Sequence, residues 1–180
     1  AVGLAAEGSR VVGYVERDAY ACATLMARME ESSLDFAPIF CGEIEDLDAT
    51  ELGSEVDLVV GGIPCQPYSL AGDLLGNEDE RALWHEFARV VAECGASMVF
   101  IENVPTFITS GGFRPLGEEL SGLGFEIVDP FFISAADIGA PHLRERVFIL
   151  AYRDIDGPEG PRQLCKLYEE KLKAQRHNLD

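Results

Sequence analysis

An apolar strand that runs directly into a tight, cysteine-bearing loop constrains this sequence more than any other feature. The run Leu58–Val60 suits a strand covered on both faces, and Gly61, Gly62 and Pro64 then end it. In an open α/β sheet, ligands and reactive groups gather just beyond the carboxyl ends of the strands. Cys65 occupies that position. We therefore predict an active-site loop, and the alternative is that Cys65 is a small buried hydrophobe.

Strand-like and helix-like stretches alternate along the rest of the chain. Glycine, proline and acidic clusters separate them, and helical periodicity is clear in the stretch after Asp18. We expect strands over 11–16, 38–41, 56–60 and 97–102, helices over 19–30, 81–94 and 115–123, and an antiparallel closing pair over 125–133 and 147–152. Residues 1–8 are expected to end a helix at Gly8. The alternation predicts an α/β fold with a mainly parallel sheet.

Composition narrows the class of protein. A chain of 180 residues with 47% hydrophobic content is long enough for one domain with a substantial core, and it shows no uninterrupted apolar run of membrane-spanning length and no signal peptide. The cysteines form no Cys-x-x-Cys pair and no Cys/His cluster of zinc spacing; they are Cys22, Cys41, Cys65, Cys94 and Cys165. We expect no disulfide framework, no metal site and a cytoplasmic location.

Two further motifs follow the Cys65 loop in a fixed order. They are Phe100–Val104, with the sequence Phe-Ile-Glu-Asn-Val, and Ala140–Phe148, with Arg144 and Arg146 two residues apart. With the loop, they resemble the nucleophile loop, the Glu-Asn-Val element and the Gln-x-Arg-x-Arg element of the DNA (cytosine-5) methyltransferases. The resemblance implies a Rossmann-like fold that uses S-adenosylmethionine, in a prokaryotic or phage enzyme of the restriction–modification type.

The resemblance divides the chain into two parts. Residues 1–153 match a partial catalytic domain, and 154–180 are expected to form a linker and a C-terminal helix. After Tyr152 only 28 residues remain, too few for the target-recognition domain that the family places there. We therefore expect that domain to be absent, so that the DNA sequence recognised is not encoded in this chain.

The cofactor site is expected at the first strands. In dinucleotide-type folds an acidic residue ends the second strand and binds ribose hydroxyls, and Glu16 ends the strand over 11–16. The resemblance implies that Glu43 and Ile44 form the adenine-binding turn, with Glu43 in place of the usual Asp. The cofactor-binding candidates are Glu16, Arg17, Glu43, Ile44, Pro64 and Leu83. Glu16 as an ordinary strand-end residue and Leu83 as simple core are the alternatives.

The glycine-rich turn that should precede Glu16 by about 20 residues falls before Ala1. We therefore expect a fold without its first, central strand. Upstream residues, a complementing chain or degeneration to a remnant would each explain this. The formal charge of −18 adds that the chain alone binds duplex DNA weakly, because phosphate binding depends on Lys and Arg. We expect the chain to be inactive alone and to self-associate or hold a partner.

Cytosine C5 is a poor nucleophile, and addition of a thiolate at C6 makes it enamine-like. Cys65 is the candidate nucleophile. Glu102 follows a buried strand, where desolvation would raise the pKa of its carboxyl so that it donates to the ring nitrogen N3. The alternative is a structural Glu that caps the next turn.

Arg144 and Arg146 share one side if they lie on a strand. The resemblance assigns Arg146 to cytosine O2 and leaves Arg144 to an ion pair or a phosphate, and their alternative is a charged edge strand. The base must be flipped out of the duplex, and the loop over 71–79 is the candidate lid.

Three functions remain open at this stage. The first is a catalytic fragment of a DNA (cytosine-5) methyltransferase, or one subunit of a split enzyme. The second is a catalytically inactive remnant or interaction module of the same fold. The third is another nucleotide-binding α/β enzyme in which Cys65 is structural. The expected partners are S-adenosylmethionine, duplex DNA and a second copy or complementing chain, without a membrane.

Overall fold

The computed structural model describes residues 8–63, 77–109 and 111–153. Cys65, Pro64 and the expected elements over 1–7 and 154–180 lie outside the described residues. In chain order the elements are β1 (Tyr14–Glu16), α2 (Ala19–Glu30), β2 (Ile39–Cys41), η1 (Ile44–Asp46), η2 (Ala49–Glu55), β3 (Leu58–Gly61), α3 (Asn77–Glu93), β4 (Met98–Asn103), α4 (Thr106–Thr109), α5 (Phe113–Gly122), β5 (Glu126–Ile127), β6 (Phe131–Ser134), η3 (Ala136–Ile138) and β7 (Glu145–Tyr152).

The described strands form two sheets. β1 and β2 pair in parallel, and a five-stranded sheet has the order β3-β4-β7-β5, with β6 also paired to β7. β3 and β4 are parallel, whereas β7 runs antiparallel to β4, β5 and β6. β7 is therefore the one strand of the larger sheet that runs against the others. The expected α/β fold with a mainly parallel sheet and an antiparallel closing strand is confirmed.

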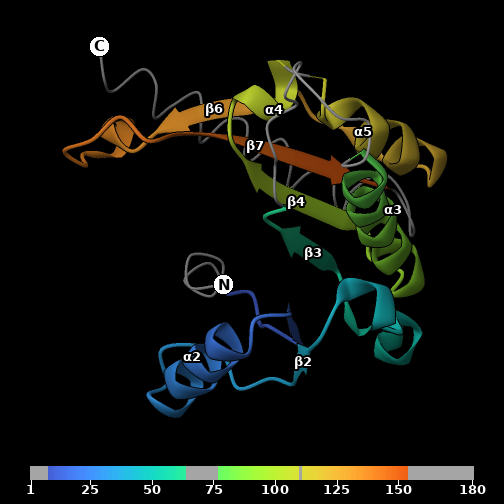
Figure 1. The fold of residues 1–180 in the computed structure, drawn as a ribbon, viewed down its shortest axis with the longest axis vertical. Helices are drawn as coiled ribbons and strands as arrows, with labels where there is room; N and C mark the ends of the chain where they lie inside the picture. Colours follow the sequence, from blue (N-terminus) through green and yellow to red (C-terminus); the bar gives the residue numbers. More distant parts are fainter. Residues whose placement is uncertain (1–7, 64–76, 110, 154–180) are drawn as a thin grey trace.

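The two sheets lie with the edge strands β1 and β3 toward each other (Figure 1). Within the described part of the chain, the second edge of β1 and the second edge of β3 pair with no strand. Val15 and Val60, in these edge strands, are 47% and 48% exposed although both are apolar. The described elements therefore leave these two edges open, and the expected lack of a central strand stays a prediction.

Local signals set the first helix correctly. α2 spans the expected 19–30, and Asp18 caps it because its Oδ1 accepts a hydrogen bond from the Ala21 N–H at 2.8 Å. α3 begins at Asn77, four residues before the expected start. The end of the expected lid, residues 77–79, is therefore helical.

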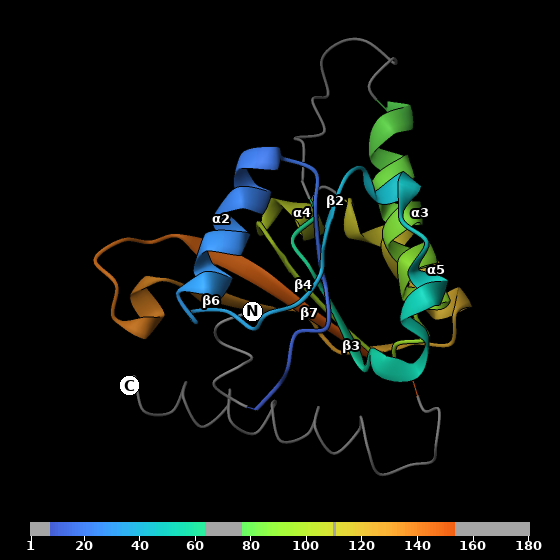
Figure 2. The ribbon, with the colours of Figure 1, turned by 90° about the horizontal axis from the view of Figure 1, so that it is seen from below.

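The main core lies between the five-stranded sheet and two helices. Figure 2 shows α3 and α5 together on one face of this sheet, with α2 on the other side. Alternate residues of β4 and β7 are buried against them: Val99, Ile101, Val147 and Ile149 are each 0% exposed. Trp84 of α3 stacks on Phe107 with ring centroids 4.8 Å apart. The sheet that carries the expected catalytic motifs is thus the best-packed part of the molecule.

Gly61 lets α3 approach the end of β3. A Cβ built at Gly61 would lie 2.5 Å from a ring carbon of Phe87, which is buried in α3. A larger residue would therefore force the Phe87 ring or the helix that carries it to move. The first glycine of the Gly-Gly pair therefore serves helix packing.

Candidate catalytic and cofactor sites

The candidate catalytic residues Glu102 and Arg146 form an ion pair. Arg146 Nε lies 2.7 Å from Glu102 Oε1. Glu102 of β4 is paired in register with Phe148 of β7, so Arg146, two residues before Phe148, is a diagonal neighbour on the same face. The antiparallel closing strand thus brings together two motifs that lie 44 residues apart in the sequence.

The burial expected for Glu102 is wrong. Its side chain is 43% exposed, whereas that of Arg146 is 22% exposed. The carboxyl group lies near the end of β4, where the strand leaves the core. Its nearest charged neighbour is the guanidinium of Arg146. Hydrogen bonding and charge, rather than desolvation, therefore define the environment of Glu102.

The second glycine of the Gly-Gly pair faces this carboxylate. A Cβ at Gly62 would lie 3.5 Å from Glu102 Oε2, in ordinary contact with it. The chain therefore leaves β3 beside the ion pair, and the absence of a side chain at Gly62 keeps that side of the carboxylate open.

Asn103 fixes the chain that leads toward the cysteine loop. It is the buried polar side chain of the described residues, 5% exposed. Its Nδ2 donates to the carbonyl of Ile63 at 3.0 Å, and its Oδ1 accepts from the Val104 N–H at 2.8 Å. From the sequence, Asn103 stands out only as part of the Glu-Asn-Val motif. The Asn103 amide thus joins the end of β4 to Ile63, which follows β3 and precedes Cys65 by two residues in the sequence.

Arg144 does not share the strand with Arg146. β7 begins at Glu145, and Arg144 lies before it with an exposed side chain. Its carbonyl accepts a hydrogen bond from the Ala135 N–H at 2.9 Å, while the guanidinium has no partner among the described residues. The strand periodicity expected to align the two arginines therefore does not extend to Arg144, and its role in an ion pair or a phosphate contact stays a prediction.

The first two strands bring the cofactor candidates together. Glu16 is the register partner of Cys41, and its carbonyl accepts from the Gly42 N–H at 3.1 Å. The Glu16 carboxylate accepts from the Asp18 N–H at 2.9 Å. Arg17 and Glu43 form an exposed ion pair at 3.6 Å. The strand-end acid Glu16 and the turn after β2 therefore lie side by side.

Ile44 and Leu83 have packing roles. Ile44 opens η1 and packs with Val90 and Cys94, while Leu83 of α3 packs on the main core. The core alternative for Leu83 is therefore supported by its surroundings, and a cofactor contact by either residue stays a prediction.

Two of the described cysteines are poor nucleophiles. A hydrogen bond with the side chain of Cys41, together with burial, raises the pKa of the Cys22 thiol to about 11. The Cys22 Sγ also donates to the Glu16 carbonyl at 3.3 Å. Burial raises the pKa of the Cys94 thiol. Both thiols stay protonated near neutral pH and lack the thiolate that nucleophilic attack requires.

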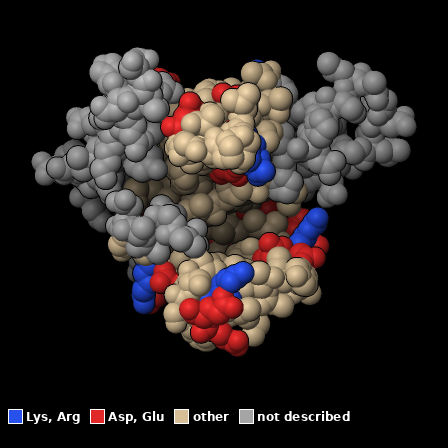
Figure 3. Space-filling view, turned by 90° about the vertical axis from the view of Figure 1, so that its left-hand side faces the viewer, with Lys and Arg blue, Asp and Glu red and all other residues tan. Residues whose placement is uncertain are grey.

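The face toward α2 and β6 is hollowed between an upper and a lower part (Figure 3). The visible floor consists mostly of uncharged residues, and acidic and basic side chains lie around the rim. In the described residues no cluster of His, Cys, Asp or Glu has the arrangement of a metal site. The helices of the described part are too short or too polar to cross a membrane.

Comparison with known proteins identifies the class. The family model described as C-5 cytosine-specific DNA methylase matches residues 1–178. The chain belongs to this family.

Individual relatives agree with this family. The chain is 37% identical over 157 residues to the Type II methyltransferase M.PspPI of Psychrobacter sp., and the match covers 85% of this chain and 36% of that protein. It is 32% identical over 199 residues to M.AquIA of Picosynechococcus sp., which covers 96% of this chain and 78% of that one. The match to M.Eco47II of Escherichia coli covers 45% of that protein. The chain therefore spans less than half the length of M.PspPI and M.Eco47II.

Solved structures support the fold. A DNA modification methyltransferase encoded in an E. coli prophage gives a TM-score of 0.68 at 24% identity, over 87% of this chain and 45% of that one. Dnmt2 of S. pombe gives 0.63 at 18% identity, over 92% and 50%. M. jannaschii TYW2, solved in complex with AdoMet, gives 0.51 at 12% identity. At these identities the likeness establishes a methyltransferase fold.

Proposed function

We propose that this chain is the catalytic part of a DNA (cytosine-5) methyltransferase, which transfers a methyl group from S-adenosylmethionine to C5 of a flipped cytosine. The observation that carries the proposal is the Glu102–Arg146 ion pair beside Gly62, in a member of the cytosine-specific methylase family. Two polar groups at one edge of the sheet suit recognition of a small planar base with donors and acceptors on adjacent atoms.

In this mechanism Cys65, as a thiolate, adds to C6 of the cytosine and makes C5 nucleophilic. Glu102 hydrogen-bonds the N3 edge, where electron density accumulates, and Arg146 binds O2. S-adenosylmethionine supplies the methyl group as a cation equivalent. Loss of the C5 proton to a base and elimination of the Cys65 thiolate then restore the aromatic ring and the enzyme.

The geometry of Arg146 suits binding to Glu102 and to a cytosine oxygen at the same time. Its Nε binds Glu102, and its Nη1 donates to the Glu145 carbonyl at 2.8 Å. Two of its three nitrogens are thereby held in place by protein groups. The fork of the guanidinium is fixed before substrate arrives, and Nη2 is the nitrogen that the described residues leave for a cytosine oxygen.

For the cofactor, Glu16 is proposed to bind the ribose hydroxyls and Ile44 to cover the adenine, with Arg17, Glu43, Pro64 and Leu83 around them. The adjacency of Glu16 and the Gly42–Glu43 turn supports this assignment. The bacterial relatives support a bacterial cytoplasm as the location. Duplex DNA as substrate and a second copy or complementing chain as partner belong to the same proposal.

The second candidate function is a catalytically inactive module of the same fold. The family match and the Type II methyltransferase relatives do not favour it over the enzyme, although the formal charge of −18 is consistent with weak binding to DNA. Isothermal titration with S-adenosylmethionine separates the two candidates, since only the enzyme has reason to retain cofactor affinity.

The direct test compares the wild-type chain, Cys65→Ser and Cys41→Ser with labelled S-adenosylmethionine and cytosine-containing duplex DNA at low salt. Each is assayed alone and with any polypeptide that co-purifies, and its oligomeric state is measured by sedimentation. We expect Cys65→Ser to abolish methyl transfer and leave the fold intact, because a serine hydroxyl is barely ionised near neutral pH. Cys41→Ser, an exposed thiol, is expected to keep the wild-type rate. Wild-type transfer by Cys65→Ser would refute the covalent route.

A further inference from the structure

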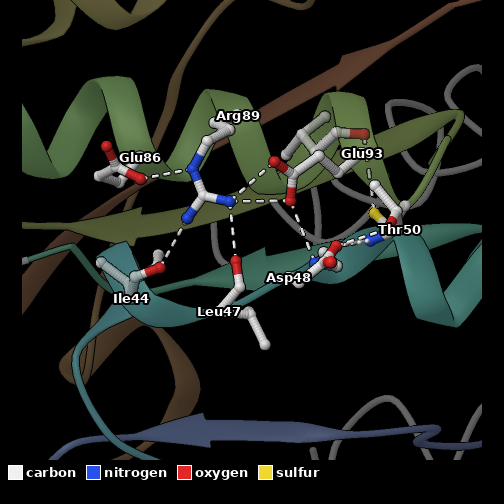
Figure 4. Close-up of polar contacts among 10 residues, drawn as sticks. Ile44, Leu47, Asp48, Thr50, Glu86, Arg89 and Glu93 are labelled. Carbon is white, nitrogen blue, oxygen red and sulfur yellow. Dashed lines mark hydrogen bonds and ion pairs between the residues drawn. The ribbon is translucent and has the colours of Figure 1, made fainter.

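Arg89 of α3 reaches across to the main chain that follows β2 (Figure 4). Its Nη2 donates to the carbonyl of Ile44 at 2.7 Å, and its Nη1 donates to the carbonyl of Leu47 at 2.8 Å. Both carbonyls belong to the η1 turn. A charged donor makes a short, strong hydrogen bond to a carbonyl. Two such hydrogen bonds to one turn fix the orientation of its backbone.

The guanidinium is itself held from the side of the helix. Its Nε binds Glu86, and its Nη1 lies 2.8 Å from both carboxylate oxygens of Glu93. The three side chains are 19–25% exposed. These hydrogen bonds to Glu93 and Glu86 raise the pKa of Arg89, so the positive charge is permanent. Arg89 therefore has little freedom to leave the turn.

Glu93 extends the contact to a third main-chain atom. Its Oε2 accepts a hydrogen bond from the Ala49 N–H at 3.0 Å, where η2 begins, and Ala49 is 0% exposed. Side chains of one helix thus bind backbone atoms of Ile44, Leu47 and Ala49. Each of these hydrogen bonds joins residues 42–45 apart in the sequence. We call Glu86, Arg89 and Glu93 the α3 clamp.

We propose that Arg89 is a positioning residue for the S-adenosylmethionine site, acting through Ile44. This inference depends on the proposed function, in which Ile44 covers the adenine. The main-chain carbonyl that Arg89 holds is that of Ile44 itself, and the Gly42 N–H, two residues earlier, bonds to the Glu16 carbonyl. The clamp therefore sets the separation between the adenine turn and the helix on which Leu83 lies.

The test is Arg89→Lys, which keeps the charge but cannot reach two carbonyls with one planar group. We expect the dissociation constant for S-adenosylmethionine, measured by isothermal titration, to rise about 10-fold. In an active assembly the KM for the cofactor rises by a similar factor while kcat at saturation stays the same. Amide exchange is expected to accelerate at Asp46 and Leu47, whose N–H groups bond within η1. Arg114→Lys, an exposed i,i+4 pair on α5, is the matched control and should change neither.

The outcomes separate the inference from the proposed function. Faster exchange in η1 with unchanged cofactor affinity overturns the inference, because the clamp is then structural only. Unchanged exchange overturns it as well. A wild-type chain that binds no S-adenosylmethionine defeats the proposed cofactor site, and the inference with it, even if exchange shows that the clamp holds the turn. If Arg89→Lys does not fold, Glu86→Gln removes one support of the guanidinium, and we expect a smaller change in the same direction.

Discussion

The half with the proposed catalytic pair, β3–β7 with α3–α5, and the half with the proposed cofactor residues, β1–α2–β2, are held by different kinds of interaction. The Glu102–Arg146 pair lies on β4 and β7, whose inner residues are completely buried beneath α3 and α5. The β1–α2–β2 half has few buried residues in the described chain, namely Cys22, Met29 and Ala37, and it exposes Tyr20 (83%) and Phe36 (87%). Its connection to the rest combines the α3 clamp on the main chain with a small apolar cluster that includes Ala49 and Val90.

The difference indicates where each function gets its precision. Apolar packing fixes the strands that carry the proposed catalytic pair, whereas the pair itself is held by an ion pair near the end of β4. The η1 turn has apolar contacts with α3 and, in addition, a few charge-assisted hydrogen bonds, which are directional but accessible to water. Changes in the core should therefore alter global stability, whereas changes in the clamp should alter local order and affinity.

Glu102→Gln gives the largest effect expected from the catalytic half. The amide keeps the shape and half of the hydrogen-bonding capacity but cannot transfer a proton, so we expect methyl transfer to fall about 10²–10⁴-fold. The measurement is the single-turnover rate at saturating cofactor. Glu118→Gln, an exposed change on α5, is the control. If Glu102→Gln and Arg146→Met lower the rate by independent, multiplicative factors, the two residues do not act as one unit.

Ile149→Ala tests the packing side of the comparison. Ile149 is 0% exposed in β7, and removing a fully buried Ile side chain is expected to lower the free energy of unfolding by about 2–5 kcal/mol. Phe36→Ala removes a larger apolar side chain from the other half, where it is 87% exposed, and should change that free energy by less than about 0.5 kcal/mol. Both changes in the free energy of unfolding are measured by urea denaturation. Similar losses for the two variants would show that the cofactor half has a core of its own.

Much of the fold could be predicted because its signals are local. The apolar period predicts helix α2 to the residue, and two apolar runs predict the antiparallel pairing of β7. Where the structure differs, a distant contact or an ambiguous composition is the cause. β1 is three residues long rather than six, and the Val11 N–H bonds to the Asp35 carboxylate instead of to a neighbouring strand.

The candidate site was predicted in identity but not in environment. The motifs gave Glu102 and Arg146, but their 2.7 Å contact follows from strand register, which the sequence does not contain. The apolar strand pattern predicts burial of Glu102 wrongly, because it does not distinguish the exposed end of a strand from its buried middle. Arg89 was missed since its partners are main-chain carbonyls; the only local signal is the spacing of Glu86, Arg89 and Glu93 at one helical turn each.

Acidification gives the smallest effect and tests the clamp directly. Hydrogen bonds from Arg89 and from the Ala49 N–H lower the pKa of Glu93 below its ordinary value of 4.5. A group whose pKa is lowered on folding contributes stability that is fully present above its unfolded pKa and is lost as the pH falls through the folded pKa. Glu93→Gln retains an acceptor for Ala49 but carries no charge at any pH. We therefore expect the wild type to melt at a higher temperature than Glu93→Gln by a constant margin between pH 7 and about pH 5.5, and the margin to shrink below about pH 4.5. Asp48, whose pKa is lowered by hydrogen bonds from Thr50, titrates in the same range but is common to both proteins and largely cancels in the difference. A margin that stays constant down to pH 3 would mean that the Glu93 charge adds nothing to the clamp, and that its hydrogen bond to Ala49 alone holds η2 against α3.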